Sequence, residues 1–138
     1  MNEAGALAII QDTIKYRFPA INTRRTRVIF VRKKDYYMAV SFAPFSYRIM
    51  VDGTILRFSE IAFKGCLAHE LCHILMVQRL SAFKRIKYFL FSGETEDEER
   101  LVDTMAVEMG FGPELLRFHE EHNKIYKPYK AKEGLTKG

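Results

Sequence analysis

The segment His69-Glu70-Leu71-Cys72-His73 places two histidines and a glutamate at a spacing suited to metal chemistry. On a helix, His69 and His73 lie about 40° apart around the axis, so both imidazoles can reach one metal ion while Glu70 projects from the edge of that face. A zinc ion held by two neutral histidines lowers the pKa of a water molecule, and a neighbouring carboxylate takes up the proton. The alternative is a pair of core histidines one turn apart, but two of the chain's four histidines occupy the pattern and its flanks are apolar. The residues therefore predict a zinc site with Glu70 as the general base.

A third metal ligand is expected from the acidic run at the start of the next predicted helix. Acidic residues at a helix start also offset the helix dipole, which accounts for most of this run. Helical phase places Glu99 on one face with Asp103, Ala106 and Gly110, and the small residues on that face allow a close approach between helices. We therefore predict Glu99 as the third ligand, with Glu96, one turn earlier, as the alternative. Asp103 is expected to accept the second ring N–H of a ligating histidine.

These motifs resemble those of the gluzincin metallopeptidases, in which H-E-x-x-H is followed by E-x-x-x-D on a later helix. Here Glu99-Arg100-Leu101-Val102-Asp103 begins 26 residues after His73. The layout from Val28 to Gly110 is also similar to the minimal members called minigluzincins and to the ImmA/IrrE peptidase domain. Val102-Asp103 stands where the ImmA/IrrE pattern usually has Ala-Asn, which favours the gluzincin side. The SprT-like proteases use a third histidine downstream, and the next histidine of this chain comes only at His119.

What the resemblance implies is a zinc-dependent peptidase that acts on a peptide or protein substrate. His69, His73 and Glu99 would bind the metal, Glu70 would act as general base and acid, and Asp103 would orient a ligand. The implied fold is zincin-like, with an N-terminal helix, a small sheet, an active-site helix and a glutamate helix.

Periodicity along the chain predicts an α+β domain at residues 1–122, followed by a basic tail at residues 123–138. A first helix is expected from Asn2 to Tyr16. A small, mostly antiparallel sheet follows, with a tight hairpin at Asp52-Gly53. The expected strands are 28–31, 36–42, 47–51 and 54–58, and the expected later helices are 61–80, 81–91, 95–109 (with a capping box of Thr95 and Glu98) and 113–123.

Composition and charge limit the classes of partner that we expect for this chain. The chain has 138 residues, 48% of them hydrophobic, and no apolar run approaches the length of a membrane span. Its net charge is +5, of which residues 123–138 contribute +4, so residues 1–122 are nearly neutral and we do not expect a nucleic-acid partner. Cys66 and Cys72 lie on one predicted helix, too far apart for a disulfide, and are interpreted as free thiols. A cytoplasmic location is expected.

Alternatives to the peptidase remain. One is a zinc-binding regulatory module without turnover, and another is a nucleic-acid-associated protein that acts through its basic tail. The tail is expected to be either a disordered, solubilising segment or an extended, aromatic segment that could occupy a peptide cleft.

The last predicted helix and several tyrosines offer further hydrogen-bond donors. His119 and His122 could supply ligands or a donor, although such polar stretches are more often solvated helix ends. The candidates for stabilising an oxyanion are Tyr47, Tyr88, Tyr126 and Tyr129.

Overall fold

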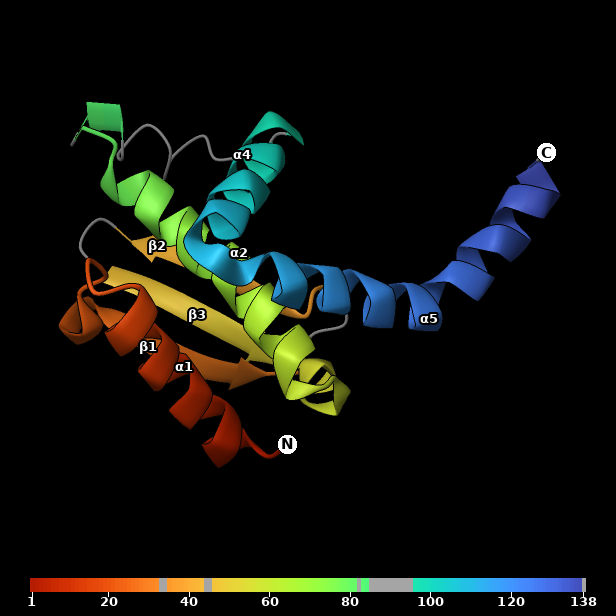
Figure 1. The fold of residues 1–138 in the computed structure, drawn as a ribbon, viewed down its shortest axis with the longest axis horizontal. Coiled ribbons are helices and arrows are strands. Elements are labelled where there is room, and N and C mark those ends of the chain that lie inside the picture. Colours follow the sequence, from red (N-terminus) through yellow and green to blue (C-terminus); the bar gives the residue numbers. More distant parts are fainter. Residues whose placement is uncertain (33–34, 44–45, 82, 85–95, 138) are drawn as a thin grey trace.

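A helix, a small sheet and a set of helices follow one another in the computed structural model of the chain (Figure 1). The structure describes residues 1–32, 35–43, 46–81, 83–84 and 96–137, with side chains described as far as residue 124. Helices and one three-stranded sheet make up this part of the chain, so the predicted α+β class is confirmed.

The first helix, α1 (Glu3–Arg17), lies where the sequence predicts it. It begins after Asn2, whose side-chain oxygen accepts a hydrogen bond from the Gly5 amide at 2.8 Å, as is usual at a helix N-cap. Its buried side chains, Ile10 and Ile14 among them, join the main hydrophobic core.

The sheet consists of β1 (Thr26–Val31), β2 (Met38–Ala43) and β3 (Ser46–Asp52), in the order β1-β3-β2. β2 pairs with β3 in antiparallel fashion, but β1 pairs with β3 in parallel. The prediction of a mostly antiparallel sheet is therefore wrong. β3 lies between β1 and β2, so one of its two neighbours is parallel and the other is antiparallel. Figure 1 shows α1 and the long central helix crossing in front of the strands, and side chains from one face of the sheet join the same core as these helices.

The predicted hairpin at Asp52-Gly53 and its fourth strand are also wrong. A short 3₁₀ helix, η2 (Gly53–Arg57), follows β3 instead. The Asp52 carboxylate accepts a hydrogen bond from the Thr54 amide at 3.0 Å, which caps this helical turn. The turn fully buries Ile55, so packing and local capping together outweigh the hairpin preference of Asp-Gly.

The central helix, α2 (Glu60–Gln78), carries the His-Glu pattern and agrees with the predicted span. The Ser59 hydroxyl accepts a hydrogen bond from the Ala62 amide at 3.2 Å and so caps its first turn. Most of α2 is buried, because helices pack on the side that the sheet does not cover. A helix buried in this way carries apolar residues all around its axis.

Two helices complete the described chain. α4 (Glu96–Ala106) leads into a π-helical turn, η3 (Val107–Phe111), and then into α5 (Gly112–Lys137). Gly110 lies in the turn with a φ of 93°, a left-handed value that favours glycine. Gly110 is exposed there, so the prediction that it lies on the packing face of α4 is wrong, whereas Ala106 is fully buried as expected.

α5 is longer than predicted. The sequence suggested an end near Asn123, but the backbone stays helical to Lys137, so the predicted extended conformation of residues 123–138 is wrong. Lysine, the most frequent residue of this segment, is a good helix former, whereas Pro128 and Gly134 oppose a helix. Figure 1 shows α5 bending partway along and leading away from the rest of the molecule.

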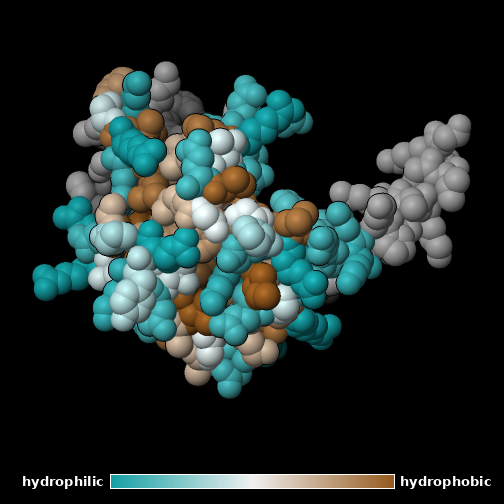
Figure 2. Space-filling view, viewed as in Figure 1, coloured by the Kyte–Doolittle hydropathy of each residue, from teal (hydrophilic) through white to brown (hydrophobic). Residues whose placement is uncertain are grey.

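Some predictions fall on residues that the structure does not describe, namely most of the helix expected at 81–91 and the capping residue Thr95. Within the described ranges, no helix is long and apolar enough to cross a bilayer. Figure 2 shows hydrophilic side chains over most of one face of the molecule, interrupted by small hydrophobic spots.

Candidate metal centre

The two histidines of the pattern lie one turn apart on α2. His73 is almost fully buried, with 1% of its side chain exposed, while 18% of the His69 side chain is exposed. Their Nε2 atoms are 3.3 Å apart, so both rings aim at the same point, as expected for positions i and i+4 of a helix.

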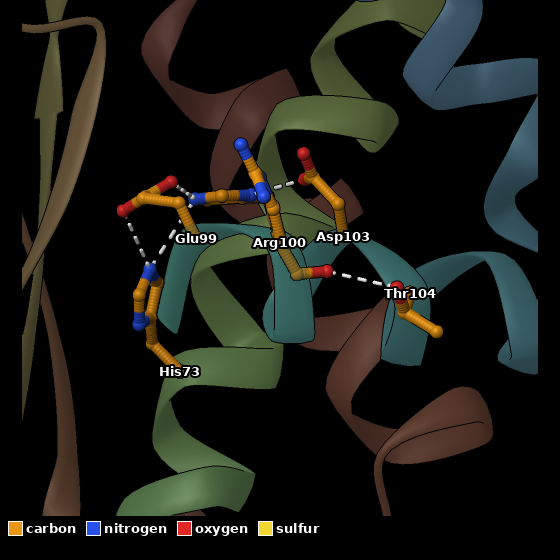
Figure 3. Close-up of polar contacts among 6 residues, drawn as sticks. His73, Glu99, Arg100, Asp103 and Thr104 are labelled. Atoms are coloured by element: carbon orange, nitrogen blue, oxygen red, sulfur yellow. Dashed lines mark hydrogen bonds and ion pairs between the residues drawn. The ribbon is translucent and has the colours of Figure 1, made fainter. Parts of the chain in front are cut away.

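Glu99 reaches this point from α4. Its carboxylate oxygens lie 2.9 Å from His69 Nε2 and 3.3 Å from His73 Nε2. Figure 3 shows Glu99 extending from α4 toward the His73 ring, with Asp103 one turn further along the same helix. α4 can come this close because Val102 and Ala106, on the same side as Glu99, are fully buried. Residues 26 positions apart therefore form one group through the packing of α4 on α2.

Asp103 fixes the orientation of His69. Its Oδ1 atom lies 2.7 Å from His69 Nδ1. An ionised carboxylate accepts, so His69 Nδ1 donates to Asp103, and Nε2, 2.9 Å from Glu99, is the ring nitrogen that could bind a metal ion. This is the usual outer hydrogen bond of a histidine that binds a metal.

The donor set fits a divalent metal ion. One ligand atom from each of His69, His73 and Glu99 lies within 4.8 Å of the others. Ligands at zinc–nitrogen and zinc–oxygen distances stand roughly 3.4 Å apart around a tetrahedral ion. The separations of 2.9 Å and 3.3 Å are close to that value. Two imidazoles and a carboxylate that converge in this way could hold such an ion.

A cavity of about 730 Å³ opens beside this group. His69, Glu99 and Asp103 line it, and so does Glu70, which follows His69 on α2. The predicted general base and two of the predicted ligands thus share one cavity. Glu96, the alternative third ligand, is exposed and lies outside the group of three.

A further part of the cavity wall comes from the residue before β2 and from α5. Tyr37, Phe118, His119 and His122 line it, and His122 Nδ1 lies 3.1 Å from the Tyr37 hydroxyl. His119 and His122 therefore line the cavity, whereas the sequence favoured a solvated helix end for this stretch. Tyr37 was missed by sequence reasoning, because no local pattern distinguishes it from the other tyrosines.

Of the four tyrosines proposed as oxyanion donors, Tyr47 is the one whose side chain the structure describes. Tyr47 lies on β3 with its ring against Phe42, and it is not among the cavity's lining residues. Tyr88 and the side chains of Tyr126 and Tyr129 lie outside the described residues.

Two close contacts help to fix α5 against α2. Gly65 is so close to α5 that a Cβ atom there would overlap the carbonyl oxygen of Glu114. At the start of α2, the Glu121 carboxylate accepts hydrogen bonds from the Ser59 amide at 2.8 Å and from the Ser59 hydroxyl, and Arg117 Nε donates a third at 2.8 Å. Burial opposes ionisation of Glu121, but these bonds outweigh it and hold its pKa below the ordinary value. The position of His119 and His122 depends on this anchoring.

Both cysteines are free and buried, as predicted. Burial raises the pKa of Cys72 to about 11 and that of Cys66 well above the usual range, with the Glu70 carboxylate adding to the effect at Cys66. Thiols in this state are poor nucleophiles and poor metal ligands. Cys66 lines the cavity, but its protonated sulfur acts there as a small apolar wall atom.

Comparison with protein-family models, with curated proteins and with solved structures gives no match to this chain. The described part of the chain holds three side chains, from two helices, that could bind a metal ion at the wall of a cavity.

Proposed function

We propose that this chain is a zinc-dependent peptidase in which Glu70 is the general base. The observation that carries the proposal is that Glu70 lines the same cavity as His69 and Glu99. A carboxylate beside a metal-binding group, with room for substrate, is the arrangement that metal-assisted hydrolysis requires.

Zinc is the metal that best suits the donor set. Two histidines and one glutamate are a ligand combination of catalytic zinc sites, and three protein ligands leave a coordination position open. A zinc ion bound there would supply Lewis-acid polarisation of the attacking water and of the substrate carbonyl.

The residues of the chain perform the remaining work. Glu70 accepts a proton from the attacking water and passes it to the leaving amine. Asp103 keeps His69 in the tautomer that directs Nε2 toward Glu99 and His73. In the same cavity, Tyr37 and His119 offer hydrogen-bond donors for the charge that develops on the carbonyl oxygen of the substrate.

The cavity suits a peptide in an extended conformation. Met38, the first residue of β2, lines it together with Leu115 and Phe118. A substrate that enters here lies alongside the sheet, with apolar side chains against the wall formed by α5. We propose a peptide or protein substrate on this basis.

The test compares Glu70→Gln with Glu60→Gln, an exposed position on the same helix. Each protein is loaded with zinc, analysed for metal content and incubated with a library of fluorescence-quenched peptides. Glu70→Gln should keep zinc and fold but lose hydrolysis, because an amide cannot accept the proton of the water. Glu60→Gln should cleave like the unmodified protein. If the unmodified, zinc-loaded protein cleaves no peptide at any pH tested, the proposal is wrong and a zinc-binding module without turnover is favoured.

A further inference from the structure

Two helices that are distant in sequence end at the same place. Arg17 is the last residue of α1, and its Nη2 atom donates a hydrogen bond of 2.6 Å to the carbonyl oxygen of Met109, in the turn that follows α4. The guanidinium carbon also lies 4.2 Å from the centre of the Phe111 ring. Phe18 also stacks on the Phe111 ring, with the two ring centres 5.7 Å apart. These contacts join the N-terminal helix to the turn between α4 and α5.

We propose that Arg17 is a positioning residue for the metal centre, because it anchors the end of the helix that carries Glu99 and Asp103. The inference rests on the proposed metal binding by His69, His73 and Glu99, and it does not require peptidase activity.

Helix electrostatics explain why an arginine is needed at this point. The C-terminal end of every helix carries a partial negative charge and free carbonyl groups. Here the ends of α1 and of the α4–η3 segment meet, so their partial charges repel each other. The Arg17 guanidinium lies between the two helix ends, and its positive charge offsets both partial negative charges. Its planar shape lets it lie on the Phe111 ring while it donates to Met109.

The anchored end of α4 is the end that determines where Glu99 lies. The buried side chains of α4 are Val102, Met105 and Ala106, all in its second half. Glu99 is in the first turn, and 38% of its side chain is exposed. Apolar packing therefore holds α4 mainly near η3, and a shift at that end changes the direction in which the first turn projects. Loss of the Arg17 contact should displace Glu99 and Asp103 from the two histidines.

The test compares Arg17→Met with Lys15→Met. Both changes remove a positive charge from the last turn of α1, but the Lys15 ammonium lies over the ring of its neighbour Tyr16, at 5.2 Å, and contributes nothing to the turn after α4. Zinc affinity is measured by competition with a chromophoric chelator, and the visible spectrum of the cobalt-loaded protein reports the ligand geometry. Arg17→Met should weaken zinc binding roughly tenfold, the scale of outer-shell effects at metal sites, and should change the cobalt spectrum. Lys15→Met should change neither.

A double-mutant cycle with Glu99→Ala shows whether Arg17 acts through Glu99. Once Glu99 is removed, Arg17→Met should cause a smaller loss of zinc affinity than it does in the unmodified protein, because only its effect through Asp103 remains. Two results would overturn the inference. One is an equal loss of zinc affinity on Arg17→Met with and without Glu99, and the other is an unchanged zinc affinity and cobalt spectrum in Arg17→Met. If Glu99→Ala alone leaves zinc affinity unchanged, the ligand set itself is wrong, which is a separate failure.

A milder variant covers the case in which Arg17→Met does not fold. Arg17→Lys keeps the charge but cannot both donate to Met109 and lie flat on Phe111. It should fold, shown by an unchanged far-ultraviolet circular dichroism spectrum, and should bind zinc more weakly than Lys15→Met. Zinc binding equal to that of Lys15→Met in folded Arg17→Lys protein would contradict the proposed role.

Discussion

α2 contacts α4 and α5 in different ways. Against α4 it presents polar side chains, with His69 and His73 facing Glu99 and Asp103. Against α5 it presents backbone, because Gly65 allows the two main chains to come into direct contact. The first contact joins side chains that could hold a metal ion, whereas the second depends on the close fit of two main chains. The cavity wall formed by α2 and α4 is therefore adjustable, and the wall formed by α2 and α5 is rigid.

The rigid contact should show the largest effect. In Gly65→Ala the added methyl group would overlap the Glu114 carbonyl, so α5 has to move, and we expect the free energy of unfolding to fall by about 3 kcal/mol. Urea unfolding in the presence of a chelator measures this loss without a contribution from metal binding. Gly53→Ala is the control, because nothing lies within 4 Å of a Cβ at that position. Equal stabilities of the two variants would show that the close contact at Gly65 is not rigid.

The adjustable contact is tested by removing its carboxylate. Glu99→Ala should lower zinc affinity roughly a hundredfold, equivalent to about 2.8 kcal/mol, because a ligand is lost. Glu98→Ala, at the neighbouring position, should retain zinc, since Glu98 is not part of the group of three. Chelator competition measures both. Equal zinc retention in the two variants would contradict the assignment of Glu99.

A smaller effect on the same contact is expected from Asp103. Asp103→Ala removes the acceptor of the His69 Nδ1 hydrogen bond, so His69 is free to rotate or change tautomer. Zinc affinity should fall roughly tenfold, with little change in unfolding free energy when no metal is bound. Glu108→Ala, an exposed acidic position in the turn after α4, is the matched control and should leave zinc affinity unchanged.

The smallest effect concerns the polar anchor of α5. Glu121→Gln should lower the free energy of unfolding by about 1 kcal/mol at pH 7, because charged hydrogen bonds to Ser59 and Arg117 become neutral or are lost. Glu120→Gln, one position earlier and 4.0 Å from Arg117, should have almost no effect.

The Glu121 contribution should also depend on pH. Its pKa in the folded protein is below the ordinary value of 4.5, so in acid the unfolded chain binds the proton more readily. The stabilisation is complete above pH 4.5 and is lost as the pH falls through the folded pKa. The difference between the unmodified protein and Glu121→Gln should therefore shrink in acid, as unfolding curves at pH 7 and pH 3 would show. A constant difference over this range would contradict the proposed role of the carboxylate.

Local patterns in the sequence predicted much of this molecule. The spans of α1 and α2 follow from apolar spacing along the chain, which involves only neighbouring residues. The closeness of His69 and His73 follows from helix geometry alone. Helical phase also separated Glu99 from Glu98, because positions on one helix keep their relative directions wherever the helix packs.

Only the tertiary structure decided the features that depend on distant partners. The parallel pairing of β1 with β3 and the replacement of the Asp52-Gly53 hairpin by η2 result from what the core can bury, which local turn preferences do not contain. The cavity wall formed by Tyr37, His119 and His122 exists because α5 packs on α2 at Gly65. Arg17 and Met109, 92 positions apart, meet because two helix ends converge. Residue types and their spacing thus determined which groups could do chemistry, and the packing of helices on a mixed sheet decided which of them face one another.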